Sequence, residues 1–196
     1  MYIEKFEDAP CIVIYHAALD VDDFIDLIED EASQSWPYLE WGKSGVGGEI
    51  SYGEYRTSLE MSLHPISQET ENERLVKIQK KYEQNVFKPM NECIWDYRSV
   101  YDLQLSRDSG WSVLKYTHDA EYHIHHDHAP DNSRVLSVVA SLGSDCEGGE
   151  LEFPYFKKTF KLEKNDVILF PSNFPYSHIA HPVTSGKKYS LVSWLI

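Results

Sequence analysis

The sequence predicts a mostly β domain, a sandwich or jelly roll, with its helices in the N-terminal part of the chain. Beyond Gly110 the chain consists of short apolar and β-branched runs separated by turn residues. Before Gly110, longer segments place apolar residues at helical spacing instead. The strand candidates beyond Gly110 are residues 111–116, 134–142, 149–153, 159–162, 166–170, 178–183 and 188–195.

The N-terminal elements begin with a short apolar run, residues 11–15, which reads as a strand. An amphipathic helix should follow, because Val21, Phe24, Ile25 and Ile28 recur at helical spacing. Asp20 is the expected N-cap of this helix, with Asp23 reaching back to the cap.

Residues 36–53 are rich in glycine and aromatic side chains, and residues 45–48 are expected to form a mobile loop. This segment could close as a lid over a substrate. Alternatively, it is an irregular surface loop whose aromatic side chains pack onto the core.

Three further elements are expected before Gly110. Residues 55–63 read as a strand, and residues 71–87 read as a helix that stops before Pro89. A third helical stretch is expected around residues 92–101.

The size and composition of the chain favour one domain spanning residues 1–196, with the helical part at 1–110 and the β core at about 111–196. No apolar run is long enough to span a bilayer, and the first residues lack the apolar stretch of a secretory signal. Three widely spaced cysteines, Cys11, Cys93 and Cys146, indicate a reducing compartment. These features predict a cytoplasmic protein without a membrane partner.

The formal net charge of −14 argues against a nucleic-acid partner, because phosphate binding requires a basic surface. Many of the acidic residues lie in residues 20–31, where a solvated helix face explains them.

A candidate metal site lies in the β region. His125 and Asp127 are two residues apart, so on a strand they project from the same face, and His178 follows 51 residues after Asp127. Two imidazoles and one carboxylate form the facial triad that binds non-haem Fe(II) and leaves positions open for oxygen chemistry. A cation, Lys188, follows ten residues after His178 and could bind an anionic cosubstrate.

The segment from about Trp111 to Ile196 resembles the catalytic core of Fe(II)/2-oxoglutarate-dependent dioxygenases, and within them the prolyl 4-hydroxylase-like branch. The resemblance rests on an ordered series of motifs, with a weaker echo of the first core strand in Arg56-Thr57-Ser58. The series comprises Tyr116, Tyr122, His125-x-Asp127, residues 148–153, residues 166–171, His178, Pro182-Val183, Gly186, Lys188 and Trp194.

The resemblance implies a double-stranded β-helix, or jelly-roll, core with helices packed on one sheet. It assigns His125, Asp127 and His178 as the iron ligands and as the catalytic residues. His178 is preferred over His181 because the family's iron histidine lies four residues before Pro-Val. A cupin-like site at His126-x-His128 is a competing assignment, but the glutamate that usually continues that motif is missing.

The resemblance also implies the cosubstrates 2-oxoglutarate and O₂, with ascorbate as a further possible cofactor. Lys188 would bind the distal carboxylate of 2-oxoglutarate, with Ser190 and the Tyr116 hydroxyl as additional hydrogen-bond donors. Tyr122 and Trp194 are expected to form walls of the substrate pocket, although either could equally be an ordinary core residue.

The chain departs from the family pattern at Ser141-Leu142-Gly143, where relatives commonly have aromatic-Leu-Asn. The cosubstrate pocket therefore either is larger or is filled by another residue.

The resemblance thus implies a hydroxylase of prolyl residues in a peptide or protein, releasing succinate and CO₂. One alternative is a hydroxylase of a free amino acid or another small molecule. An alternative from a different class is a β-helix binding module without catalysis.

Overall fold

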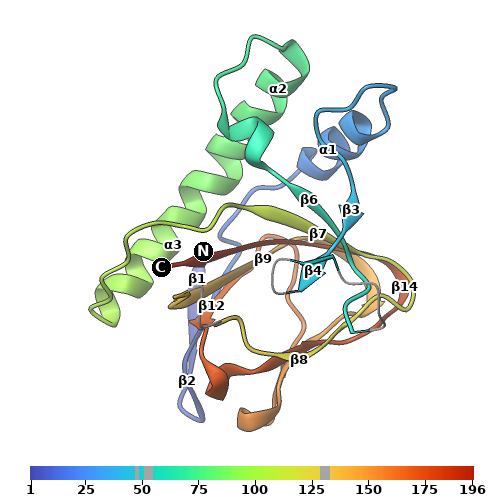
Figure 1. Cartoon of the computed structure of the whole chain (residues 1–196). Coiled ribbons are helices and arrows are strands. Elements are labelled where there is room, and N and C mark those ends of the chain that lie inside the picture. Colours follow the sequence, from blue (N-terminus) through green and yellow to red (C-terminus); the bar gives the residue numbers. More distant parts are fainter. Residues whose placement is uncertain (47–48, 51–54, 129–132) are drawn as a thin grey trace.

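The computed structural model describes residues 1–46, 49–50, 55–128 and 133–196. Figure 1 shows the helices on one side of a set of curved β-sheets. The helices are α1 (Phe24–Ala32), α2 (Glu73–Tyr82) and α3 (Lys88–Val100). The strands are β1 (Tyr2–Phe6), β2 (Ala9–His16), β3 (Gly42–Lys43), β4 (Gly45–Val46), β5 (Glu49–Ile50), β6 (Leu59–Ser62), β7 (Ser112–Tyr116), β8 (Tyr122–His125), β9 (Leu136–Gly148), β10 (Leu151–Phe153), β11 (Lys158–Phe160), β12 (Val167–Pro171), β13 (His178–Ala180) and β14 (Val183–Leu195).

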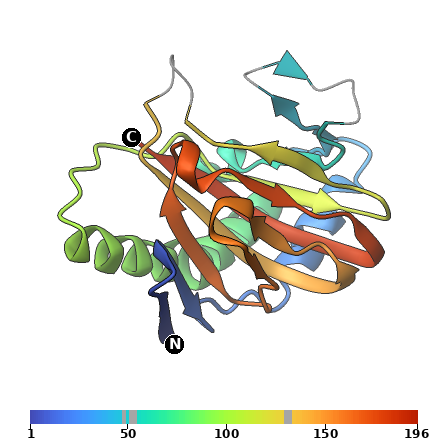
Figure 2. The ribbon, with the colours of Figure 1, turned by 90° about the horizontal axis from the view of Figure 1, so that it is seen from below.

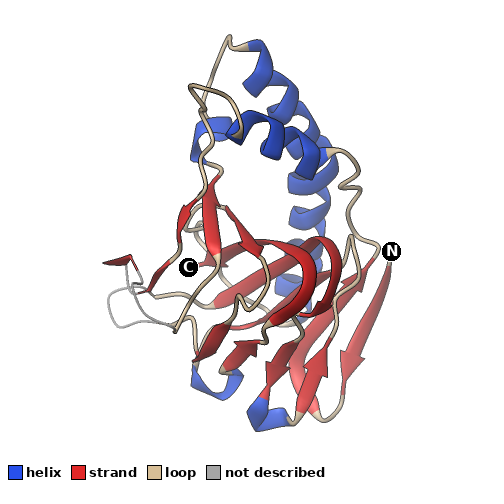
Figure 3. Cartoon of the chain, turned by 90° about the vertical axis from the view of Figure 1, so that its right-hand side faces the viewer, coloured by secondary structure: helices blue, strands red, loops and turns tan. Residues whose placement is uncertain are grey.

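Two facing sheets form the core of the fold. The larger has eight strands in the order β1-β2-β12-β9-β14-β7-β6-β3, and the smaller has four in the order β11-β10-β13-β8. Figure 3 shows the helices gathered against one side of this β core. The predicted jelly-roll core with helices packed on one sheet is therefore confirmed.

The larger sheet is buried on both faces, and strand alternation explains how. In β2, Val13 and Tyr15 pack into the cluster that contains the helices, whereas Ile12 and Ile14 pack into the cluster between the two sheets. Alternate side chains of a strand point to opposite faces, so a strand covered on both sides reads as a continuous apolar run. Residues 11–15 show this pattern.

The start of α1 differs from the prediction. The helix begins at Phe24, and Asp23 precedes it with a φ of 63° and no side-chain capping hydrogen bond. The Asp20 carboxylate instead accepts a hydrogen bond from the Asn85 side-chain amide at 2.9 Å. Asp20 is therefore not the N-cap, because a distant partner competes for its side chain.

The sequence predicted that the helical segment of residues 71–87 would stop before Pro89, but the helical run continues past this proline. A π-helical turn, Glu83–Phe87, connects α2 to α3, and Pro89 lies in the first turn of α3, where a missing N–H is tolerated. The carbonyl of Asn85, four residues before Pro89, accepts a hydrogen bond from the Asp20 backbone N–H at 3.1 Å. Proline has no N–H to donate to this carbonyl, and the Asp20 N–H takes its place.

The seven strand candidates beyond Gly110 all correspond to strands, although β9 extends further, to Gly148, and β14 begins earlier, at Val183. The strand predicted at residues 55–63 is shorter, as β6. Strand β1 was not predicted, because four of its five residues are exposed and no apolar alternation marks it. Within residues 36–53 the structure contains β3, β4 and β5, while residues 47–48 and 51–53 lie outside the described part of the chain.

Candidate active site

The two candidate metal-binding histidines lie on neighbouring strands of the smaller sheet. His125 ends β8, His178 begins β13, and the two residues are direct partners in the antiparallel register. Asp127 follows β8 and lies 9% exposed between the sheets. Its carboxylate oxygens are 3.6 Å from Nε2 of His125 and 3.9 Å from Nε2 of His178. The three residues form a group whose ligand atoms lie within 4.8 Å of one another.

The orientation of each imidazole is fixed through its other nitrogen. Nδ1 of His125 lies 2.8 Å from the carbonyl oxygen of His123, and Nδ1 of His178 lies 3.1 Å from that of Tyr176. A nitrogen facing a carbonyl must carry the proton, so Nε2 of each neutral ring faces the group with its lone pair. Burial, together with the neighbouring His178, lowers the pKa of His125 to about 3, which keeps its ring neutral.

The Asp127 carboxylate is held from the larger sheet. The Ser137 hydroxyl on β9 donates to Oδ2 at 2.6 Å, and the Trp194 side chain also hydrogen bonds to the carboxylate. Burial alone would raise the pKa of Asp127, but His178, His125 and these hydrogen bonds hold the pKa below its ordinary value. A carboxylate and two imidazoles that present Nε2 fit a divalent first-row metal ion.

Lys188 lies on the larger sheet, on β14, directly opposite Tyr116 of β7. Its ammonium donates to the Gly149 carbonyl at 2.7 Å and lies 4.9 Å from the centroid of the Tyr116 ring. Burial lowers the pKa of Lys188 to about 8, as expected for a cation with little solvation. Ser190, two residues further along β14, lines the same cavity.

A cavity of about 860 Å³ connects the histidine group to Lys188 and Ser190. Tyr122 forms part of its wall, with its ring stacked on His125 at 3.5 Å between centroids. Trp194 forms another part, with the Arg134 guanidinium 3.6 Å from the centroid of its ring. The volume falls in the range of small-molecule sites.

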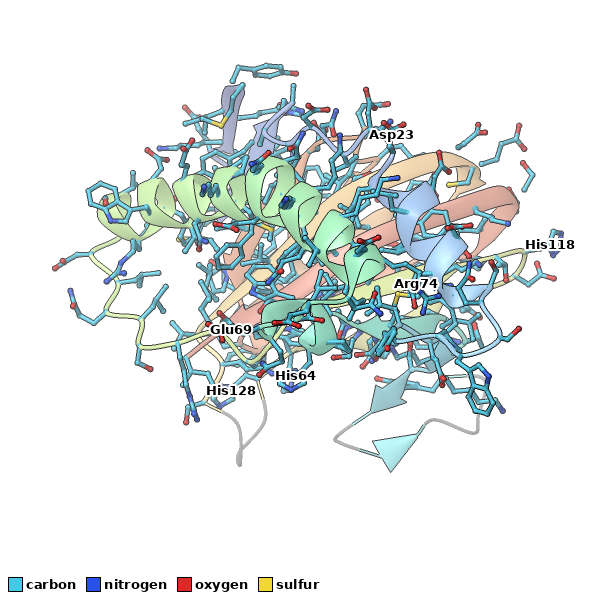
Figure 4. The ribbon with its side chains drawn as sticks, turned by 90° about the horizontal axis from the view of Figure 1, so that it is seen from above. Asp23, His64, Glu69, Arg74, His118 and His128 are labelled. Atoms are coloured by element: carbon cyan, nitrogen blue, oxygen red, sulfur yellow. The ribbon has the colours of Figure 1, made fainter. Side chains whose placement is uncertain are left out.

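The remaining histidines of the motif region lie outside the three-residue group. His126 and His128 line the cavity, whereas His123 pairs with Glu121. His118 pairs with Asp119, and Figure 4 shows it at the far side of the molecule from His128. Among the described residues, the cupin-like pair His126 and His128 does not join a cluster of metal-binding groups.

His181, the alternative to His178, lies 2.7 Å from the Glu152 carboxylate and outside the cavity.

Sequence reasoning missed two residues that shape the site. Ser137 and Arg134 both contact Asp127, the arginine through the Asp127 carbonyl at 3.3 Å. A serine within the otherwise apolar run Val135–Ala140 was the available signal for Ser137, because a buried hydroxyl requires a partner. Arg134 precedes β9 and carries no comparable signal.

The sequence of residues 111–196 matches the profile of the 2OG-Fe(II) oxygenase superfamily. This matched segment contains both histidines, Asp127 and Lys188. The β core of this chain, residues 111–196, is therefore similar in sequence to the 2OG-Fe(II) oxygenase superfamily. Among curated proteins, none matches the sequence.

Solved structures show that the fold as a whole is similar to that of prolyl hydroxylases. A prolyl hydroxylase from Trichoplax adhaerens, in complex with a peptide fragment of the hypoxia inducible factor oxygen degradation domain, is 15% identical, with a TM-score of 0.70, covering 95% of this chain and 83% of that one. A prolyl-4-hydroxylase from Pseudomonas putida is 16% identical, with a TM-score of 0.70 and coverages of 94% and 92%. The viral collagen prolyl hydroxylase of Paramecium bursaria Chlorella virus-1 is 17% identical, with a TM-score of 0.63 and coverages of 96% and 97%.

None of the helices in the described ranges has the length and apolar character required to cross a bilayer.

Proposed function

We propose that this protein is an Fe(II)- and 2-oxoglutarate-dependent dioxygenase that hydroxylates prolyl residues in a peptide or protein. The observation that carries the proposal is the position of two complementary groups in one cavity. The His125, Asp127 and His178 group lies at one wall, and the partly buried Lys188 lies at another. A metal-chelating 2-oxo acid with a distal carboxylate has the matching chemistry at its two ends.

Each residue has a distinct role in this proposal. His125 and His178 would present Nε2, and Asp127 a carboxylate oxygen, to Fe(II). Lys188 would bind the distal carboxylate of 2-oxoglutarate, with Ser190 and Tyr116 as neighbouring hydroxyl donors. Tyr122 and Trp194 would hold the substrate against the metal-facing side of the cavity.

Bound Fe(II) would supply the activation of O₂. Overall, one oxygen atom of O₂ enters the C–H bond of the substrate as a hydroxyl group. The other enters succinate as 2-oxoglutarate loses CO₂. The protein's part is to orient both organic molecules and to keep bulk water from the reacting atoms.

A prolyl substrate is supported by the likeness of the fold to prolyl hydroxylases, one of which is in complex with a peptide fragment. The open cavity suits a chain-like substrate, because exposed Ile124 and Tyr55 line it alongside the metal group. The second candidate, hydroxylation of a free amino acid or another small molecule, is favoured by the cavity volume of about 860 Å³.

The proposal is tested by measuring succinate and a +16 Da product with proline-containing peptides and free amino acids. His125→Ala and His178→Ala should each abolish turnover and weaken Mn(II) binding, because each removes a ligand. His126→Ala is the matched control, since this histidine lines the cavity without joining the metal group, and it should keep metal binding. Full activity in His125→Ala would contradict the proposal. So would a native protein that binds the metal but forms no succinate with any substrate tested. The second outcome would favour a non-catalytic binding module.

A further inference from the structure

Lys188 also lines a smaller cavity of about 20 Å³. Four residues line both this cavity and the large one, namely Val139, Leu151, Lys188 and Ser190. The small cavity therefore adjoins the large one at the lysine. Ser141 lines only the small cavity.

Strand alternation places Ser141 on the same face of β9 as Val139, and a β-bulge follows directly after it. In the pairing of β9 with β14, Tyr189 lies opposite Gly143 and Ser190 lies opposite Ser141, so Leu142 is the extra residue. A bulge redirects the side chains on either side of it. Here Leu142 packs into the core under the helices, and Ser141 faces Ser190 across the two strands.

The small cavity has polar groups from two serines and two lysines among apolar side chains. The Ser141 and Ser190 hydroxyls have no hydrogen-bond partner among the described residues, and Lys188 has one, the Gly149 carbonyl. Lys161 lines the cavity as well, bonded to the carbonyls of Cys146 and Gly148 and 3.9 Å from Glu150. A space of this size holds about one water molecule or a comparable ligand group.

We infer that the cosubstrate pocket extends past Lys188 to Ser141 and accepts 2-oxo dicarboxylic acids one methylene longer than 2-oxoglutarate. The inference rests on the proposed function, because it assumes that Lys188 binds the distal carboxylate. With 2-oxoglutarate, one water bridges Lys188 and the two serines. With the longer acid, the carboxylate itself enters the small cavity and displaces that water, taking hydrogen bonds from Ser141 and Ser190 beside the two lysines.

The experiment compares 2-oxoglutarate with 2-oxoadipate, its homologue with one more methylene, by calorimetric titration of the Mn(II)-loaded protein. Mn(II) replaces Fe(II) so that binding is measured without turnover. In the native protein, the dissociation constants of 2-oxoadipate and 2-oxoglutarate should agree within about tenfold. Ser141→Val fills the small cavity. This variant should lose at least about tenfold more affinity for 2-oxoadipate than for 2-oxoglutarate.

Ser112→Val is the matched control, because Ser112 lies on the neighbouring strand β7 and lines neither cavity. It should leave the ratio of the two affinities unchanged. Binding of 2-oxoglutarate to the native protein with 2-oxoadipate more than about a hundredfold weaker would overturn the inference and leave the proposed function intact. Binding of neither acid would overturn both. The comparison in the native protein decides the question even if Ser141→Val fails to fold.

Discussion

Ser137 is the residue on which the orientation of Asp127 most depends. Its hydroxyl is buried, donates to the Asp127 carboxylate at 2.6 Å and lies 2.9 Å from the Ser172 hydroxyl. A partner that fixes a metal-binding carboxylate in this way typically contributes as much to metal affinity as a weak ligand does.

Ser137→Ala should therefore weaken Mn(II) binding about 10- to 100-fold while the fold is kept. The loss arises because the carboxylate gains freedom to rotate away from the two imidazoles. Titration of metal into the apoprotein measures the effect, with thermal unfolding as the check on the fold. Ser193→Ala is the matched control, because this buried serine bonds to the Gly110 carbonyl instead. Equal metal affinity in Ser137→Ala and the native protein would show that Ser137 does not contribute to metal binding.

Lys188 gives the site a pH dependence with a definite sign. Its pKa is lowered to about 8 by burial, and a lysine carries its charge only below its pKa. The affinity for 2-oxoglutarate should thus fall as the pH rises through about 8, with the midpoint displaced upward by the bound carboxylate.

Lys188→Met should bind 2-oxoglutarate about 10- to 100-fold more weakly, corresponding to about 1.5–3 kcal/mol for a charge-assisted hydrogen bond. Its affinity should show no further loss above pH 8. Lys187→Ala serves as the control, since Lys187 is exposed and lies outside the cavity. Calorimetry between pH 6.5 and 9.5 separates the cases, and a native affinity that is constant over this range would exclude Lys188 as the anion-binding group.

At the scale of the elements, helix α1 is attached to the larger sheet through Glu29. The Glu29 carboxylate accepts hydrogen bonds from Lys115 of β7 and Tyr189 of β14, both at 2.6 Å, and from the Trp41 indole at 3.2 Å. Burial opposes ionisation, yet these bonds lower the pKa of Glu29 below its ordinary value. The stability that Glu29 contributes is therefore present above its unfolded pKa and lost as the pH falls through its lower folded pKa.

Glu29→Ala should lower the free energy of unfolding by about 1–3 kcal/mol, because three donors, one of them a lysine, lose their acceptor. Asp30→Ala is the matched control, since Asp30 is the next residue of the same helix and is exposed. Urea unfolding at pH 7 compares the two variants. The difference between native protein and Glu29→Ala should shrink in acid, and a difference that persists unchanged when Glu29 is protonated would rule out this account.

The elements that the sequence predicted well are those whose pattern is local. The strands beyond Gly110 carry their alternation and turn residues within a few positions. His125 and Asp127 were expected on one strand, but β8 ends at His125 and Asp127 follows it. The errors arose where a distant partner decides the outcome. Asp20 bonds to Asn85 rather than capping α1, and the same contact allows the helical run to pass Pro89. Trp41 packs against Tyr189 and bonds to Glu29, which fits the alternative of an aromatic side chain packed onto the core.

At the scale of the whole molecule, the segment that matches the family profile depends on the rest of the chain. Strand β2 pairs with β12, and β6 pairs with β7, so residues 1–110 supply both flanks of the larger sheet. The helices cover the face of that sheet that carries Val113, Val138 and Leu191. Figure 2 shows the N-terminal strands beside the C-terminal half of the chain. We propose that residues 1–196 form one folding unit.

A fragment comprising residues 111–196 should therefore fail to fold alone, because it exposes an apolar sheet face and two unpaired strand edges. Expressed by itself, it should aggregate or give an amide spectrum without dispersion, whereas the full chain should unfold in a single transition. A dispersed spectrum from the isolated fragment would show that the β core is a separate domain.

The carbonyl of Ser172 has a consequence for how the site opens. It accepts hydrogen bonds from the backbone N–H groups of both Asp127, at 3.1 Å, and His128, at 2.9 Å, while the Ser172 N–H donates to Val135. The chain leaving β8 is thereby tied to the segment that leads into His178. In hydrogen exchange, the Asp127 and His128 amides should become exposed together in one cooperative opening, rather than one after the other. The Asp127 carboxylate would then move away from the His178 imidazole in that same opening, so metal release would proceed at the rate of that one opening.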